Sequence, residues 1–128
     1  RLEDRVSADY MERMRVKAKG IRQGISALSG GNQQKIVLSR WIAAKKKLIL
    51  LDEPTRGVDV GAKQEIYDNL KRLAAQGVGI IIFSSETDEL LSSSDRILIM
   101  REGRIVKELI TARTSSEEIL HYSIAAAD

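Results

Sequence analysis

A short apolar run that ends in two carboxylates constrains the fold of this chain more than any other feature. Leu48–Leu51 contains no polar residue and is followed at once by Asp52, Glu53 and Pro54. Such a run is typical of a strand that is buried on both faces of a parallel sheet. A second apolar run, Val78–Phe83, is rich in isoleucine and predicts another buried strand.

An amphipathic segment between these runs predicts a helix over residues 62–76, with Gly77 as its stop. A strand, a helix and a second strand in this order indicate an α/β fold with parallel pairing in the middle of the chain. Asn32–Lys46 also has apolar residues at helical spacing, and Trp41 within it is predicted to belong to the core.

The C-terminal part predicts a hairpin and a helix. Two short runs, residues 96–100 and 104–106, flank a Glu-Gly pair and are typical of a β-hairpin. Ser115 and Glu118 have the spacing of a capping box, which predicts a final helix that ends near Ala126. The lone histidine, His121, is predicted to be a surface residue of this helix.

The charge of the chain is concentrated at one end. The 128 residues carry a net charge of +3, and residues 1–24 hold seven basic and four acidic side chains, which leaves the remainder neutral. A solvated face or linker is favoured over a nucleic-acid contact, because no aromatic side chain interleaves the basic run for base stacking. The first half of this segment is compatible with a helix, which Gly20 and Gly24 would interrupt.

Several protein classes are excluded by composition. With 43% hydrophobic and 30% charged residues, the chain is neither a disordered tail nor a collagen or coiled coil. No cysteine is present, so disulfides and thiolate metal sites are excluded, and a reducing cytoplasm is compatible. Its apolar stretches are too short to cross a bilayer, and residues 1–20 lack the apolar centre of a signal peptide.

A Ser-Gly-Gly turn opens the first long predicted helix, within the sequence Leu28–Lys35. Gly30 and Gly31 allow backbone amides to approach an anion, and Ser29 adds a hydroxyl donor at the positive end of the helix. Taken alone, such a turn is more often only a helix entry.

The carboxylates after the first strand are the stronger chemical signal, because open α/β sheets bind ligands at the carboxyl ends of their strands. Asp52 suits Mg²⁺, which prefers one or two carboxylates together with phosphate oxygens. Glu53 would then lie beside the metal and orient or deprotonate an attacking water. The alternative is a strand-to-loop turn that merely uses acidic and proline residues.

Together the two motifs resemble the ABC ATPases. Leu28–Lys35 is similar to their signature motif, Leu48–Glu53 to their Walker B strand, and Thr55–Gly61 to their D-loop, with Asp59 at its acidic position. The sequence LSGGNQQK followed by LDEPTRGVDVGAK most resembles the second, C-terminal ATPase half of the ATP-binding subunits of bacterial sugar importers. Asn32, where most ABC proteins have glutamine, is typical of this ribose, galactose and xylose class.

The resemblance implies a partial P-loop NTPase fold from which the phosphate-loop strand is absent. No Gly-Lys dipeptide occurs in the chain, so it contains no phosphate loop. The expected parts are the end of a helical subdomain (residues 1–27), the ATPase core (28–110) and a C-terminal helix (111–128). The chain is therefore expected to be the C-terminal part of an ATPase half and to be inactive alone.

The resemblance also assigns roles to individual residues. Its signature residues would contact the ATP that the opposite ATPase half binds: Ser29, Gly30, Gly31 and Asn32. Asp52 would hold Mg²⁺, Glu53 would be catalytic, and Asp59 would link the two halves. Ser85 occupies the position of the family's switch histidine; its hydroxyl can bind a phosphate or water but cannot carry an imidazolium charge. Glu86 is predicted to cap the following turn.

The partners that the resemblance implies are a second ATPase half, membrane permease subunits and, indirectly, a sugar-binding protein, with no nucleic acid. The location implied is cytoplasmic, peripheral on the inner face of the cell membrane. Strand edges that lack the phosphate-loop strand predict a homodimer or a strand-swapped assembly.

Two other hypotheses about the function of the chain stay open. One is the C-terminal lobe of a DNA-repair or chromosome ABC ATPase, which predicts heptad repeats before the signature; residues 1–26 show none. The other is a non-catalytic module that completes the ATP site of a partner.

Overall fold

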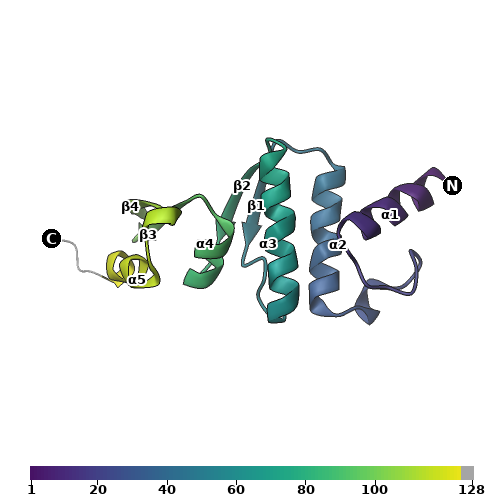
Figure 1. The fold of residues 1–128 in the computed structure, drawn as a ribbon, viewed down its shortest axis with the longest axis horizontal. Helices are drawn as coiled ribbons and strands as arrows, with labels where there is room; N and C mark the ends of the chain where they lie inside the picture. The colour runs from purple at the N-terminus through teal and green to yellow at the C-terminus, as the bar shows by residue number, and fades with distance from the viewer. Residues whose placement is uncertain (125–128) are drawn as a thin grey trace. The chain divides into compact units, whose positions relative to one another are not determined.

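A computed structural model describes residues 1–124 of the chain (Figure 1). The main elements follow in this order: α1 (Leu2–Arg13), α2 (Gly30–Ala43), β1 (Leu48–Asp52), α3 (Val60–Ala75), β2 (Gly79–Phe83), α4 (Thr87–Ser93), β3 (Arg96–Arg101), β4 (Arg104–Ile110) and α5 (Ser116–Ile124). The chain forms two compact units, which divide within β2 after Ile81. Among the described helices, none has both the length and the apolar character needed to cross a membrane.

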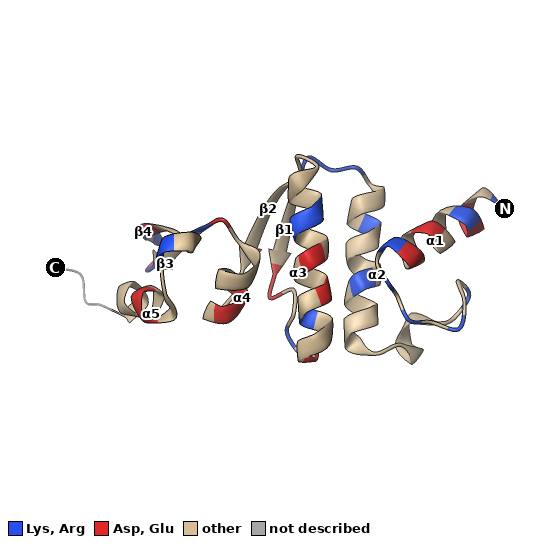
Figure 2. Ribbon diagram, viewed as in Figure 1, with Lys and Arg blue, Asp and Glu red and all other residues tan. Residues whose placement is uncertain are grey.

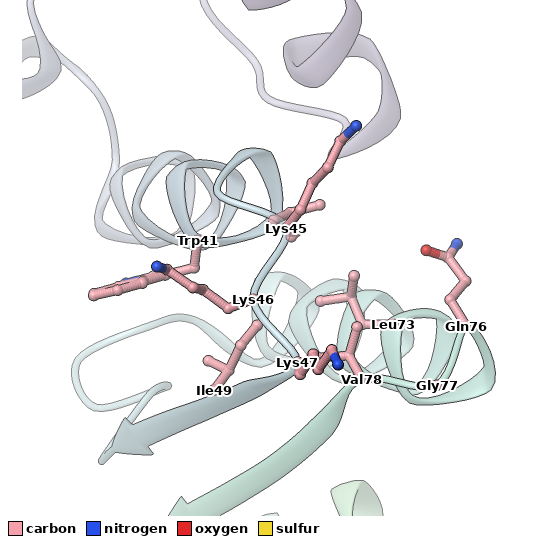
Figure 3. A pocket seen from close by; sticks show the side chains of 10 residues that line it. Trp41, Lys45, Lys46, Lys47, Ile49, Leu73, Gln76, Gly77 and Val78 are labelled. Atoms are coloured by element: carbon pink, nitrogen blue, oxygen red, sulfur yellow. The ribbon is translucent and has the colours of Figure 1, made fainter.

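The first unit confirms the predicted α/β arrangement. Strands β1 and β2 are hydrogen-bonded neighbours, and α3 connects them. Both strands run in the same direction, as the two arrows in Figure 3 show. Helices α2 and α3 contact each other and lie side by side (Figure 1). In α1, acidic and basic side chains are mixed along the helix (Figure 2), as expected for a solvated face.

Helix α3 supplies much of the core of the first unit. Its stripe of Ile66, Leu70 and Leu73 is buried, with Ile66 fully inaccessible to solvent. Burial of each such side chain stabilises the fold by about 1.5–3 kcal/mol. Gly77 adopts φ +87°, a left-handed conformation that favours glycine, and so ends the helix where the sequence predicts.

The prediction that β1 is buried on both faces is wrong, and so is the prediction that β2 is a buried strand. In β1, Ile49 and Leu51 are buried, but Leu50 between them is 61% exposed. Ile81 of β2 is also exposed. Successive side chains of a strand point to opposite faces, and in the described chain only one face of β1 is covered. Trp41 on α2 is 49% exposed, so its assignment to the core is wrong as well.

The second unit confirms the predicted hairpin. Strands β3 and β4 pair antiparallel, with a register shift between Ile99 and Met100. Glu102 and Gly103 both have positive φ, as a tight two-residue hairpin turn requires. The core of this unit is formed by four buried side chains: Ile97, Ile99, Leu109 and Ile119.

Helix ends differ from the prediction in several places. Helix α2 begins at Gly30 and ends at Ala43, so it starts and ends earlier than the predicted residues 32–46. At α5, Ser115 Oγ accepts a hydrogen bond from Glu118 N (3.3 Å), but the Glu118 carboxylate accepts from Thr114 instead. The predicted capping box is therefore only half formed. The predicted end of this helix near Ala126 lies outside the described residues.

Candidate functional site

The N-terminus of α2 presents an open hydroxyl. Ser29 is the N-cap residue, and its backbone carbonyl accepts from Gln33 N (2.9 Å). Its side chain makes no capping hydrogen bond to the helix and is exposed, as is Gly30. The first amides of the helix and the Ser29 hydroxyl are therefore accessible, which is the chemistry expected of an anion contact.

Asn32 links this hydroxyl to the segment that precedes the motif. Its Nδ2 donates to Ser29 Oγ (2.9 Å), and its Oδ1 accepts from the backbone N–H of Lys17 (2.8 Å). Beside them lies an open cavity of about 410 Å³, which Ser29, Asn32, Lys17, Lys19 and Gln23 help to line. No local sequence pattern indicates that the leading segment reaches the signature motif.

Gly31 has a packing role that the sequence did not indicate. It is buried, and a Cβ at this position would lie 2.6 Å from Cβ of Ala62 on α3 and 3.4 Å from Val58 Cγ1. Only glycine allows the first turn of α2 to approach the first turn of α3 this closely. Gly30 is less constrained, since its Cβ would stand 3.5 Å from the nearest atom, Gly57 O.

Asp59, the D-loop residue, starts helix α3. As the N-cap it accepts a hydrogen bond from Ala62 N through Oδ1 (3.0 Å), and its carboxylate lies at the positive end of the helix. Its Oδ2 lies 3.8 Å from the position that a Cβ of Gly31 would occupy. The structure therefore brings the signature and the D-loop residues of one chain together.

Asp52 and Glu53 lie where β1 ends. Asp52 is the last residue of the strand and is exposed, and Glu53 is half-buried with φ +45°. A positive φ is uncommon outside glycine and is found at sites where the surroundings enforce it. Here a turn holds it, in which Arg56 N donates to Glu53 O (3.2 Å) and the fully buried Thr55 has its hydroxyl 3.3 Å from that of Tyr67.

Asp52 fits the chemistry of Mg²⁺ only together with a nucleotide. Within residues 1–124, no group of three or more His, Cys, Asp or Glu side chains is placed to hold a metal ion. Mg²⁺ needs few protein ligands, because phosphate oxygens and waters complete its octahedron. One exposed carboxylate beside a second acid meets that requirement.

A buried ion pair ties the signature helix to its surroundings. The Lys35 ammonium group is 3% exposed and donates to Glu65 on α3 and to the Arg15 carbonyl (3.1 Å). The hydrogen bond from Lys35 and its positive charge hold the pKa of Glu65 below its usual range, although partial burial acts in the opposite sense. The helical periodicity of the sequence did not predict this pair, because a lysine at the end of the motif is expected to be exposed.

Ser85 and Glu86 belong to the second compact unit, in the connection between β2 and α4. Ser85 is exposed. Glu86 is the N-cap residue of α4 but makes no side-chain capping bond, so the predicted cap is wrong; its backbone N–H donates to Ser84 Oγ (3.0 Å). His121 is exposed, as predicted.

A second cavity lies near the start of β1 and is lined by none of the predicted site residues. Its volume is about 290 Å³, and Figure 3 shows Trp41, Lys45, Lys46 and Lys47 around it. The three lysines follow the C-terminus of α2, where positive charge is favourable. Helix stabilisation accounts for their position, and no carboxylate, hydroxyl or thiol lines this cavity.

Comparison with known proteins agrees with this geometry. The family described as "ABC transporter" matches residues 3–56. The xylose import ATP-binding protein of Geobacillus kaustophilus is 50% identical over 119 residues, which are 93% of this chain and 24% of that protein. A ribose import ATP-binding protein of Rhizobium etli is 49% identical over 120 residues, 94% of this chain and 24% of its own length.

Residues 3–56 of the chain are thus similar to the ABC transporter family. The chain spans about a quarter of the length of these relatives. Among solved structures, an ATP-binding cassette of an ABC transporter in its ADP conformation matches with a TM-score of 0.73 and 26% identity, over 91% of this chain and 44% of that one. The ABC ATPase fold of this chain, incomplete at the phosphate loop, is thereby established.

Proposed function

We propose that this chain is the C-terminal part of the second ATPase half of a sugar-import ATP-binding subunit. The observation that carries the proposal is the close approach of Gly31 to the start of α3, which joins the signature motif to the D-loop. Sequence identities of 50% and 49% to a xylose and a ribose import ATP-binding protein support an assignment to sugar transport. The intact protein would couple ATP hydrolysis to carbohydrate uptake.

At its own ATP site, the chain would supply the acidic groups. Asp52 would contribute one ligand to Mg²⁺, which when bound neutralises charge on the phosphates. Glu53, held half-buried by the turn after β1, would orient a water and accept its proton as the water attacks the γ-phosphorus. The phosphate loop of that site would come from a part of the protein outside these 128 residues.

At the opposite site, the chain would supply donors. The Ser29 hydroxyl and the first amides of α2 would bind the γ-phosphate of ATP that the other half holds. Asp59 would act at the boundary of the two halves. Ser85 would offer a hydroxyl where the family uses histidine, so it would bind phosphate or water without adding positive charge.

The proposed partners follow from this role. They are a second ATPase half, membrane permease subunits, and a sugar-binding protein that acts through the permease. The proposed location is the cytoplasmic face of the cell membrane. Selection of the sugar would belong to the permease and the binding protein.

Replacement of Glu53 by glutamine tests the proposal. In the intact ATP-binding protein that contains this segment, Glu53→Gln should lower magnesium-dependent ATP turnover by about 100-fold, since the base is lost while its shape remains. Asp68→Asn on the exposed face of α3 is the matched control and should leave turnover unchanged. Full turnover in Glu53→Gln would contradict the proposal.

A further inference from the structure

Both polar atoms of the Asn32 side chain are engaged inside the protein. A backbone N–H can only donate, so the atom that faces Lys17 N must be Oδ1, and the Nδ2 group must face Ser29 Oγ. The orientation of the amide is therefore determined by its neighbours. An Asn32 amide held in this way is arranged to support other groups.

The hydrogen bond from Asn32 limits the direction in which the Ser29 hydroxyl can donate its proton. Its oxygen accepts a hydrogen bond from Asn32 Nδ2, and its side chain makes no bond to the backbone of its own helix. The hydroxyl proton is left to point to solvent at the open N-terminus of α2. Without Asn32, the hydroxyl would be able to turn and donate to a neighbouring acceptor instead.

The preceding segment is held by three side chains at alternate residues. Lys35 binds the Arg15 carbonyl (3.1 Å), Asn32 binds Lys17 N (2.8 Å), and Gln23 Oε1 accepts from Lys19 N (2.6 Å). These three hydrogen bonds hold the segment in which the exposed Lys17 and Lys19 lie, and both lysines line the cavity beside Ser29. A cavity lined by two exposed lysines and by Ser29 at a helix N-terminus is an environment suited to a polyphosphate.

We propose that Asn32 is a positioning residue, which turns the Ser29 hydroxyl proton toward the triphosphate of a nucleotide and holds Lys17 and Lys19 beside it. This inference rests on the proposed function, because the triphosphate is the one that the opposite ATPase half binds. It makes residues 15–19 part of the nucleotide-binding surface.

Amide hydrogen exchange in the 128-residue chain tests the anchoring without any activity measurement. Asn32→Ala should accelerate exchange at the Lys17 amide at least tenfold, while the amide of buried Leu70 reports whether the fold is intact. Gln64→Ala is the matched control, since it removes an amide side chain whose bond to Asp68 is exposed. An unchanged Lys17 amide in folded Asn32→Ala would overturn the inference.

Turnover in the intact ATP-binding protein tests the effect on Ser29. Ser29→Ala should lower kcat by about 100-fold, as for loss of one preorganised donor. If Asn32 acts through Ser29, its loss should cost less in the Ser29→Ala background than in the wild-type protein, so the double variant Ser29→Ala/Asn32→Ala should retain more turnover than the product of the two single losses. Strictly multiplied losses would overturn the action of Asn32 through Ser29. Absence of turnover in the wild-type protein would instead contradict the proposed function, and the exchange experiment would still decide the role of Asn32.

Discussion

The Lys35 side chain is buried, and its ammonium group donates hydrogen bonds to Glu65 and to the Arg15 carbonyl. Glu65 itself is 34% exposed, so solvent would partly replace its charge if it were removed. The pair joins the signature helix, the leading segment and α3 through a single side chain. Its main effect is therefore to hold the polar surface around Ser29 in one arrangement.

The stability of the chain should depend on pH through Glu65. Its pKa in the folded chain lies below the ordinary value of 4.5, so the stabilisation is present above that pH and is lost as the pH falls through the folded pKa. Because the Glu65 side chain is 34% exposed, solvent screens it, and Glu65→Gln should lower the free energy of unfolding by only about 1 kcal/mol at about pH 7. Denaturant titrations should show this difference shrink as the pH falls below 4.5. A difference that stays constant there, or that Asp68→Asn reproduces, would contradict the assignment.

At the scale of elements, the contact between α2 and α3 joins the signature motif to the D-loop. Gly31→Ala should destabilise the chain by about 1–3 kcal/mol, because its Cβ would meet that of Ala62 at 2.6 Å. Ala62→Gly removes that obstacle, so the double variant should recover most of the additional loss. The measurement is a double-mutant cycle on the free energy of unfolding.

Gly30→Ala is the control for this cycle, since its Cβ would make only an ordinary 3.5 Å contact. It should not couple to Ala62→Gly. Strictly additive effects of Gly31→Ala and Ala62→Gly would show that the two residues do not interact, and the proposed link between the motifs would then be wrong.

The elements themselves were largely predictable from local pattern. Periodicity predicted α3 and the β3–β4 hairpin, because a helical stripe and a Glu-Gly turn are encoded in adjacent residues. The one-sided burial of β1 was not predictable, because a continuous apolar run does not show which face of the strand other elements cover. The motif residues were found by their resemblance, whereas the roles of Lys17 and Lys35 depend on contacts between distant segments that no local pattern records.

At the scale of the whole chain, apolar strand surface remains uncovered. Within the described residues, β2 pairs only with β1, and its Ile81 and Phe83 are 45% and 49% exposed. An unpaired strand edge with exposed apolar side chains favours pairing with another chain. Light scattering should therefore give the mass of a dimer or larger assembly, and Ile81→Lys should shift the chain toward monomer. A wild-type monomer at high concentration would contradict this prediction.

The most direct test of the account is magnesium-dependent ATP turnover by the pure 128-residue chain. Glu53 is the proposed base, but the sequence holds no phosphate loop to bind the nucleotide beside it. The account predicts no turnover by the chain alone, and restoration only where a phosphate loop is supplied by the rest of the protein. Turnover by the isolated chain that Glu53→Gln abolishes would contradict it.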